Sequence, residues 1–442
     1  MTIMTRDDAR AILEKVVTFS KADGCEANLD GSVEGNIRYA RNSVSTAGET
    51  RSVDLAVQCN FGKKVGTATI NEFDDDSLAK VVARAEETAR LAPESPEFMP
   101  VLRPQKYDES RAFVNKTADI DPTYRAEAAA ASIGPSKKQG ATAAGFLNDS
   151  ASFSAMMNSE GLFAYHTETN VNFTVTVRTN DGTGSGWASS DDNDVSRVDT
   201  AATSDVALQK ALMSREAKAL EPGKYTVILE PDAAAQIIGR MFFAFGARQA
   251  DEGRSFLTKK GGGSRIGEQV FDERVTAYGD PLDARVPTAT WSSTGEPISR
   301  LSIIKDGVVE NLFYDRYWAD KEDVAPVPQP TNLIMVGGDQ SQAELIKNTE
   351  RGILVSRLWY IRALDPQTQL YTGLTRDGTF YIEDGEIKYP VKNFRFNDSP
   401  VIMLNNLDDL GQSQRVNLFG FPVMMPSMRI REFTFSSLSD AV

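Results

Sequence analysis

The sequence predicts an α+β protein of two domains, a mixed domain over residues 1–220 and a β-rich domain over residues 221–442. Helical apolar stripes and alternating strands follow one another in the first half, whereas Asp-Gly pairs between apolar runs dominate the second half. A chain of 442 residues with 41% apolar residues is long enough to bury two sizeable cores. We expect the second domain to hold an antiparallel sheet or barrel with one buried helix.

The elements near the N-terminus alternate between helix and strand. Thr5 and Asp8 form a capping-box pattern, which predicts a helix at the start of the chain. Alternating apolar residues over 53–61 predict a strand, and a turn joins it to a second strand over 65–69. A second helical stripe then ends at a proline-rich connector near 93–107.

The boundary between the domains is predicted at Pro222-Gly223, which close a helical segment. Before it, apolar residues alternate strictly over 171–177 and predict a strand. After it, Asp306-Gly307, Asp377-Gly378 and Asp384-Gly385 each lie between apolar runs. These pairs are typical of tight turns between antiparallel strands, and the last predicts a type I′ hairpin.

One long helix is predicted inside the β-rich half, over residues 231–247. Pro231 suits the first turn of a helix, and apolar residues from Ala234 to Phe245 recur on one stripe. A helix of this kind is expected to be buried against the sheet. Taken alone, the stripe indicates core packing.

The chain has one histidine, His166, and two cysteines, Cys25 and Cys59. A zinc hydrolase needs several imidazole or thiolate ligands, and the usual serine or cysteine hydrolase needs a histidine base beside its nucleophile. These chemistries are excluded unless a partner supplies the missing groups. Two cysteines in so long a chain make no disulfide framework, so we expect reduced, partly buried thiols.

The charge balance bears on the choice of partner. With 62 acidic against 48 basic residues the formal net charge is −14, which repels nucleic acid. No stretch approaches the roughly eighteen uninterrupted apolar residues of a membrane span, and the N-terminus has no signal sequence. We therefore expect a cytoplasmic protein that binds neither nucleic acid nor membrane.

Five passages of the chain carry a family resemblance. They are Asn-Ser-Glu-Gly at 158–161, Leu-Glu-Pro-Gly-Lys-Tyr-Thr-Val-Ile-Leu-Glu-Pro at 220–231, Arg-Ile-Gly-Glu at 265–268, Arg-Gly-Ile-Leu-Val at 351–355, and Thr-Arg-Asp-Gly-Thr-Phe-Tyr-Ile-Glu-Asp-Gly-Glu-Ile at 375–387. In this order, the passages resemble the TldD/PmbA (TldE) family of metalloprotease subunits. The resemblance covers nearly the whole chain and implies the two-domain fold of that family.

The resemblance also implies where a zinc site would lie. In the TldD branch the long helix carries a His-Glu-x-x-x-His motif, and a cysteine near the C-terminus is a further ligand. The motif positions fall on Phe242, Phe243 and Ala247 here, and no cysteine follows Cys59. The chain is therefore most similar to the TldE/PmbA branch, which lacks the ligands and pairs with a zinc-bearing TldD-type subunit.

Two further segments are candidates for contact with a peptide. Gly261, Gly262 and Gly263 lie in a basic loop that lacks the spacing of a phosphate-binding loop, so we interpret it as a mobile hairpin that could gate a cleft. Trp291 occupies what looks like a family loop near the cleft, where its ring could contact a peptide. Plain packing is the alternative interpretation for Trp291.

Two polar groups suggest other chemistry only weakly. Residues 191–194, Asp-Asp-Asn-Asp, lack the glycine and distal glutamate of a calcium loop, which favours a polar turn. His166 shares a strand face with Glu168, and a structural or surface role is the simpler interpretation.

The main hypothesis is a non-catalytic, TldE-like subunit that forms a heterodimer with a TldD-like metalloprotease and helps it bind extended or unfolded peptides. Zinc is expected in the partner and no cofactor in this chain. The alternative is a stand-alone homodimeric peptide-binding protein without protease activity. A third hypothesis, an enzyme that uses two convergent carboxylates, needs a pocket that the sequence cannot reveal. No catalytic residue is predicted.

Overall fold

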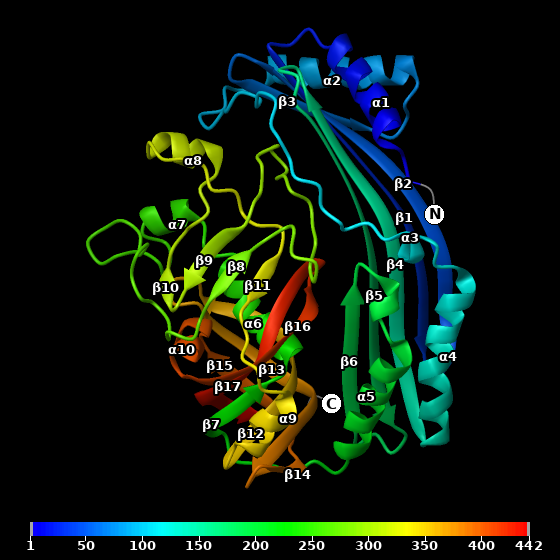
Figure 1. Cartoon of the computed structure of the whole chain (residues 1–442), viewed down its shortest axis with the longest axis vertical. Coiled ribbons are helices and arrows are strands. Elements are labelled where there is room, and N and C mark those ends of the chain that lie inside the picture. Colours follow the sequence, from blue (N-terminus) through cyan, green and yellow to red (C-terminus); the bar gives the residue numbers. More distant parts are fainter. Residues whose placement is uncertain (1–2, 440–442) are drawn as a thin grey trace.

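The computed structural model describes residues 3–439, and it contains two β-sheets that lie side by side (Figure 1). The first sheet has six antiparallel strands in the order β3-β2-β1-β4-β5-β6. These strands are β1 (Gly24–Ala40), β2 (Ser43–Phe61), β3 (Lys64–Ile70), β4 (Ala141–Asn158), β5 (Phe163–Thr179) and β6 (Ser185–Asp192). The accompanying helices are α1 (Arg6–Phe19), α2 (Asp75–Leu91), α3 (Asn115–Ala118), α4 (Pro122–Lys138), the 3-10 helix η1 (Val195–Arg197) and α5 (Thr200–Met213). This mixture confirms the predicted α+β class.

One face of the first sheet is apolar and covered by helices. Leu29 and Leu55 are fully buried in a cluster with side chains of α1 and α2. Leu147 and Phe173 are fully buried in a second cluster with side chains of α4 and α5. The alternation over 171–177 lies in β5, with its apolar side chains in this second cluster, which confirms the predicted strand.

The opposite face of the first sheet is polar. Asn36, Asn148 and Asn172 stand in one row across β1, β4 and β5. Asn148 and Asn172 line a cavity together with Arg415 and Asn417 of the second domain. The polar face is therefore turned toward the second domain.

The second sheet has eleven strands, and five of them close a barrel. The pairings β7-β12-β13-β15-β17 return to β7, because β17 also pairs with β7. The strands are β7 (Gly223–Leu229), β8 (Ala277–Gly279), β9 (Leu301–Lys305), β10 (Val308–Val309), β11 (Leu333–Met335), β12 (Arg351–Asp365), β13 (Leu370–Glu383), β14 (Glu386–Pro390), β15 (Phe394–Asp398), β16 (Leu407–Leu418) and β17 (Phe421–Leu438). The helices are α6 (Pro231–Phe242), α7 (Ala247–Asp251), α8 (Arg316–Lys321), α9 (Gln342–Lys347) and α10 (Pro400–Asn405).

Two of the three predicted Asp-Gly turns are confirmed. Asp306-Gly307 joins β9 to β10 and Asp384-Gly385 joins β13 to β14, each with positive φ at both residues. The prediction for Asp377-Gly378 is wrong, because these residues lie inside β13. They oppose Ser356 of β12 at a register shift and form a β-bulge.

The buried helix is confirmed, but it is shorter than the predicted span of 231–247. α6 ends at Phe242, and its stripe lies in the main core cluster. Beyond it, Phe313 donates its N–H to the Phe245 carbonyl at 2.9 Å and accepts the Ala247 N–H at 2.8 Å. This strand-like pairing replaces the helical hydrogen bonds, so α7 begins as a separate helix at Ala247.

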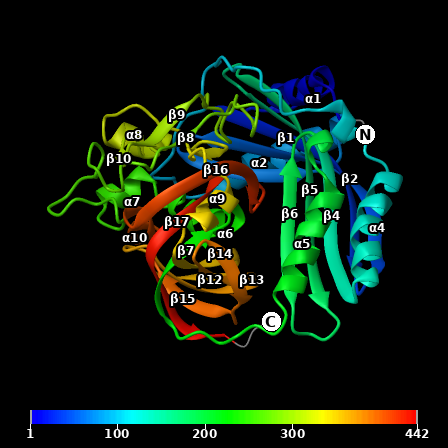
Figure 2. The same ribbon diagram turned by 60° about the horizontal axis from the view of Figure 1, so that its bottom comes forward.

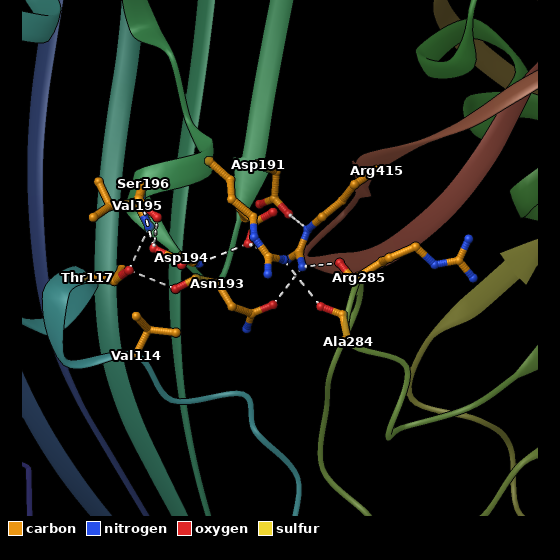
Figure 3. A network of polar contacts seen from close by, with 12 residues as sticks. Val114, Thr117, Asp191, Asn193, Asp194, Val195, Ser196, Ala284, Arg285 and Arg415 are labelled. Atoms are coloured by element: carbon orange, nitrogen blue, oxygen red, sulfur yellow. Dashed lines mark hydrogen bonds and ion pairs between the residues drawn. The ribbon is translucent and has the colours of Figure 1, made fainter.

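The two domains are joined by a polar network between β6 and β16 (Figure 3). Arg415 donates from Nε to Asp191 at 3.0 Å, and from Nη1 to Asn193 at 2.6 Å and to the Arg285 carbonyl at 2.9 Å. Asp194 caps η1 by accepting the Ser196 N–H. The predicted polar turn covers only part of residues 191–194, because Asp191 and Asp192 end β6 and only Asn193 and Asp194 lie in the bend before η1. Asp191 and Asn193 hold the domains together through Arg415. Figure 1 and Figure 2 both place β6 at the edge of its sheet nearest the second domain.

None of the helices in the described part of the chain is long and apolar enough to cross a membrane. Cys25 and Cys59 are free, fully buried and directly opposite each other on β1 and β2. Both thiols are buried more completely than the partial burial that the sequence predicts.

Candidate functional site

The three positions that correspond to the zinc motif lie where α6 ends. Phe242 is 6% exposed, Phe243 is 53% exposed and Ala247 is fully buried. The Phe242 and Phe245 rings stack with their centroids 5.1 Å apart, and the cavity beside Phe242 and Phe243 measures only about 20 Å³. That volume is close to the smallest that holds one water molecule. Because none of the three side chains has a donor atom for zinc, this site does not fit the metal.

No other part of the described chain offers a replacement set of metal ligands. Among residues 3–439, no three His, Cys, Asp or Glu side chains come together to hold a metal ion. His166 lies on β5 opposite Ser154, with its Nε2 3.6 Å from a carboxylate oxygen of Glu168. This nitrogen is buried and has no hydrogen-bond partner in the described part of the chain.

Three neighbouring cavities lie on the side of the second domain that faces the polar sheet. A cavity of about 460 Å³ lies between Phe146, Trp187 and Arg357, and one of about 380 Å³ lies between Asn148 and Asn417. A third, of about 350 Å³, is lined by both Arg357 and Asn417. Because the third cavity shares a lining residue with each of the others, the three are neighbours, and we call them together the cleft.

Arg357 lines two of the three cavities of the cleft. Its guanidinium carbon lies 4.4 Å from the ring centre of Trp187 and 4.8 Å from that of Trp359, so the side chain is sandwiched between two tryptophans. Its Nη1 donates to Asp377 at 3.0 Å. Burial lowers the pKa of Arg357, and the Asp377 charge opposes this effect. Asp377 lies at the β-bulge of β13, opposite the register shift beside Arg357.

Exposed aromatic rings form one wall of the cleft. Trp359 is 41% exposed, Tyr360 61% and Phe419 68%. Asn148, Asn172 and other polar side chains of the first sheet line the neighbouring cavity. The cleft thus offers both apolar contact and hydrogen bonds, the combination that ligand sites in proteins typically have.

Two carboxylates do come together, at the start of α6. Glu230 accepts from Lys210 Nζ at 2.6 Å and from Ser356 Oγ at 2.9 Å, and Asp232 accepts from Ser189 Oγ at 3.0 Å. Burial raises the pKa of Asp232 to about 6. Neither carboxylate lines the cleft. Because Lys210 and Ser189 belong to the first domain, this cluster links the two domains.

The predicted peptide-contact residues lie outside the cleft. Gly261, Gly262 and Gly263 form the exposed tip of a hairpin loop, each with φ between 79° and 109°. Trp291 is 8% exposed and packs with Met156 in a small apolar cluster. None of these four residues lines the cleft cavities.

Several residues of the cleft were not predicted from the sequence. Arg240, Arg357 and Phe419 belong to no motif. The one local signal is the run Arg-Leu-Trp-Tyr-Ile-Arg at 357–362, where arginines and aromatic residues gather in a strand of an acidic protein.

Comparison with known proteins identifies the family. Models of the PmbA/TldA metallopeptidase domains match residues 25–89 (domain 1), 114–217 (central domain) and 222–437 (C-terminal domain). This chain belongs to the TldD/PmbA family. The family assignment made from the five sequence passages is therefore confirmed.

Individual relatives of this TldD/PmbA family protein are distant. Metalloprotease PmbA from Escherichia coli O157:H7 is 22% identical over 455 residues, covering 97% of this chain and 98% of that protein. A metalloprotease from Methanothermobacter thermautotrophicus is 24% identical over 297 residues, covering 61% of this chain and 62% of that protein. The crystal structure of TldE from Thermococcus kodakarensis has a TM-score of 0.85 at 17% identity, covering 96% of this chain and 99% of that one. The last comparison shows a shared fold.

Proposed function

We propose that this protein is a non-catalytic, TldE-like subunit that pairs in the cytoplasm with a zinc-bearing TldD-type protein and helps it bind extended or unfolded peptides. One observation carries the proposal. The motif positions Phe242, Phe243 and Ala247 lie at a packed aromatic end of α6, in a protein of a metallopeptidase family. Chemistry that needs zinc must then come from another subunit.

The cleft supports the peptide part of the proposal. An unfolded segment presents apolar side chains and unpaired backbone amides together. Trp359 and Phe419 can receive the apolar side chains, while Asn148 and Asn172 can pair with the amides. The neutral amide side chains suit peptides of varied sequence, because they donate and accept equally.

The test is to purify the chain alone and again after co-expression with a homologue from the same genome that keeps the histidine motif. We expect no stoichiometric zinc and no peptidase activity alone, and a stable complex that cleaves unfolded peptides. The homologue purified alone is the control for activity that needs no second subunit. Stoichiometric zinc together with peptidase activity in the isolated chain would overturn the proposal.

A homodimeric peptide-binding protein is the second candidate, and the free edge of β2 favours it. β3 pairs with β2 only from Leu55 onward, so the outer edge of residues 43–54 has no strand partner within the described chain. Residues 43–52 are exposed on both faces. Two copies that pair antiparallel about Thr50 would place Glu49 opposite Arg51 of the other copy, twice. A complex with the homologue that leaves this edge free would favour the first candidate.

A further inference from the structure

The third cavity of the cleft, which we call the arginine pocket, combines stacked arginines with exposed aromatic rings. Its lining includes Arg240, Arg357, Trp359, Tyr360, Arg362 and Phe419. The guanidinium carbon of Arg240 lies 4.7 Å from the ring centre of Phe419, and that of Arg362 lies 4.4 Å from the ring centre of Tyr360. A guanidinium stacked in this way keeps the N–H groups at its edge free to donate.

The positive charges of the arginine pocket have too few counterions. Neither Arg240 nor Arg362 forms an ion pair with any carboxylate in residues 3–439, although the chain as a whole carries 62 acidic residues. The Nε atoms of Arg240 and Arg357 are buried without a hydrogen-bond partner in the same part of the chain. Burial first, and then the nearby charge of Arg362, lower the pKa of Arg240. Unpaired buried donors cost stability, so an anion that paired with them would bind favourably.

The backbone of the pocket is strained at the two stacked aromatic residues. Tyr360 has φ of 53° at a register shift of β12, and Phe419 has φ of 56° in the two-residue turn from β16 to β17. Bulky residues rarely adopt this conformation, and such turns favour Asn or Gly at the position of Phe419. Both aromatic side chains are nevertheless exposed to solvent, and each ring stacks on an arginine, Tyr360 on Arg362 and Phe419 on Arg240. Strain that is kept at an exposed site points to a role in binding.

We propose that the arginine pocket binds a carboxylate of the peptide, with an adjacent apolar side chain against Tyr360 and Phe419. Arg240 and Arg362 donate to the two carboxylate oxygens, and Arg357 closes the inner end of the pocket, where Asp377 holds it. The inference rests on the proposed function, since it assigns part of a peptide to this part of the cleft. The carboxylate has two possible sources, the C-terminus of a peptide and the side chain of Asp or Glu.

Three dye-labelled peptides test the proposal by fluorescence anisotropy with the full chain. All three are extended peptides that end in Phe. The first has a free C-terminal carboxylate, the second has the same sequence with a C-terminal amide, and the third has the amide and a Glu in place of the residue before the Phe. We expect the free carboxylate or the Glu peptide to bind about tenfold or more tightly than the plain amide, as charge-assisted hydrogen bonds provide. Which of the two gains affinity identifies the source of the carboxylate.

Variants of the pocket arginines test whether the preference for a carboxylate arises in the arginine pocket. Arg240→Gln combined with Arg362→Gln should remove the preference, and the double Lys variant should keep part of it. Arg300→Gln is the control, because Arg300 stacks on Tyr278 outside the cleft and has Asp280 as its counterion. Equal binding of all three peptides to the unmodified chain would overturn the pocket assignment while leaving the proposed function intact. This outcome can be measured without any variant. Failure of every peptide to bind would overturn both.

Discussion

The guanidinium of Arg415 on β16 donates to the carboxylate of Asp191 on β6 across 3.0 Å, with both side chains almost completely buried (Figure 3). These residues are 224 positions apart in the chain. Their ion pair joins the two domains beside the cleft, so the shape of the cleft depends on it.

Replacing Arg415 by Ala should lower the free energy of unfolding by about 3 kcal/mol or more, because Asp191 is left buried without its cation. Arg415→Lys should restore only part of this, since one ammonium cannot reproduce the planar fork that reaches Asp191, Asn193 and the Arg285 carbonyl. Urea unfolding measures both. Arg395→Ala, on an exposed side chain of β15, is the control and should change stability by less than about 0.5 kcal/mol. Equal losses for the two alanine variants would contradict the assigned role.

Writing the zinc motif back into the sequence should not restore a zinc site. In the triple variant Phe242→His, Phe243→Glu, Ala247→His, the last imidazole would enter a fully buried position, where overpacking costs about 1–3 kcal/mol. The pairing of Phe245 and Ala247 with Phe313 also separates position 247 from α6. Metal analysis after dialysis should find far less than one zinc per chain. Stoichiometric zinc would show that the end of α6 adapts easily to the metal.

The contribution of Asp232 to the stability of the protein should fall as pH rises from about 4 to about 6. The folded-state pKa of about 6 lies above the ordinary value of 3.8, so the folded protein holds this proton more tightly than the unfolded chain does. The resulting stabilisation is complete below pH 3.8 and is lost as pH rises through 6, a change of about 3 kcal/mol. Asp232→Asn keeps an acceptor for Ser189 and lacks this titration, so its stability relative to the unmodified protein should rise over this range.

Unfolding curves of both proteins between pH 4 and pH 7 measure this difference. Asp76→Asn, at an exposed first-turn position of α2, is the control for the loss of one negative charge near a helix N-terminus. Parallel curves for the unmodified protein and the Asp232→Asn variant would show that Asp232 does not titrate in this range.

Phe419→Asn should stabilise the protein and weaken peptide binding. Asn tolerates the positive φ of this turn better than Phe, so we expect a gain of about 1 kcal/mol in the free energy of unfolding. The same change removes the ring that stacks on Arg240, and peptide affinity should fall by about fivefold or more. Thermal unfolding and peptide anisotropy on the same preparation check both parts. A variant that lost stability but kept its peptide affinity would show that the ring packs for stability alone.

If the homodimer forms through the edge of β2, exchanging the charges of Glu49 and Arg51 should leave the dimer intact, whereas changing one of them alone should weaken it. Glu49→Arg would place two arginines opposite each other and weaken the dimer, whereas Glu49→Arg combined with Arg51→Glu would restore it. Sedimentation velocity over a range of concentrations measures the association. Dimers that are equally strong in the unmodified chain and the single variant would exclude this edge as the interface.

Much of the fold could be predicted from local patterns. Alternation over 171–177 led to β5, and Asp384-Gly385 led to the hairpin of β13 and β14, because side-chain periodicity and turn conformation are local properties. The same reasoning failed at Asp377-Gly378. A dipeptide that accepts positive φ suits a β-bulge as well as a turn, and only its pairing with Ser356 decides between them.

For the candidate site, too, some features follow from the sequence and others only from the tertiary structure. The sequence alone determined that Phe242, Phe243 and Ala247 carry no zinc donor, since that follows from residue type. Only the tertiary structure decided that α6 stops at Phe242 and that Arg240 and Phe419 meet in one pocket. These residues come from a helix and a distant hairpin, which are brought together by closure of the barrel and burial of a shared core. That closure depends on contacts between residues far apart in the chain, which no local pattern records.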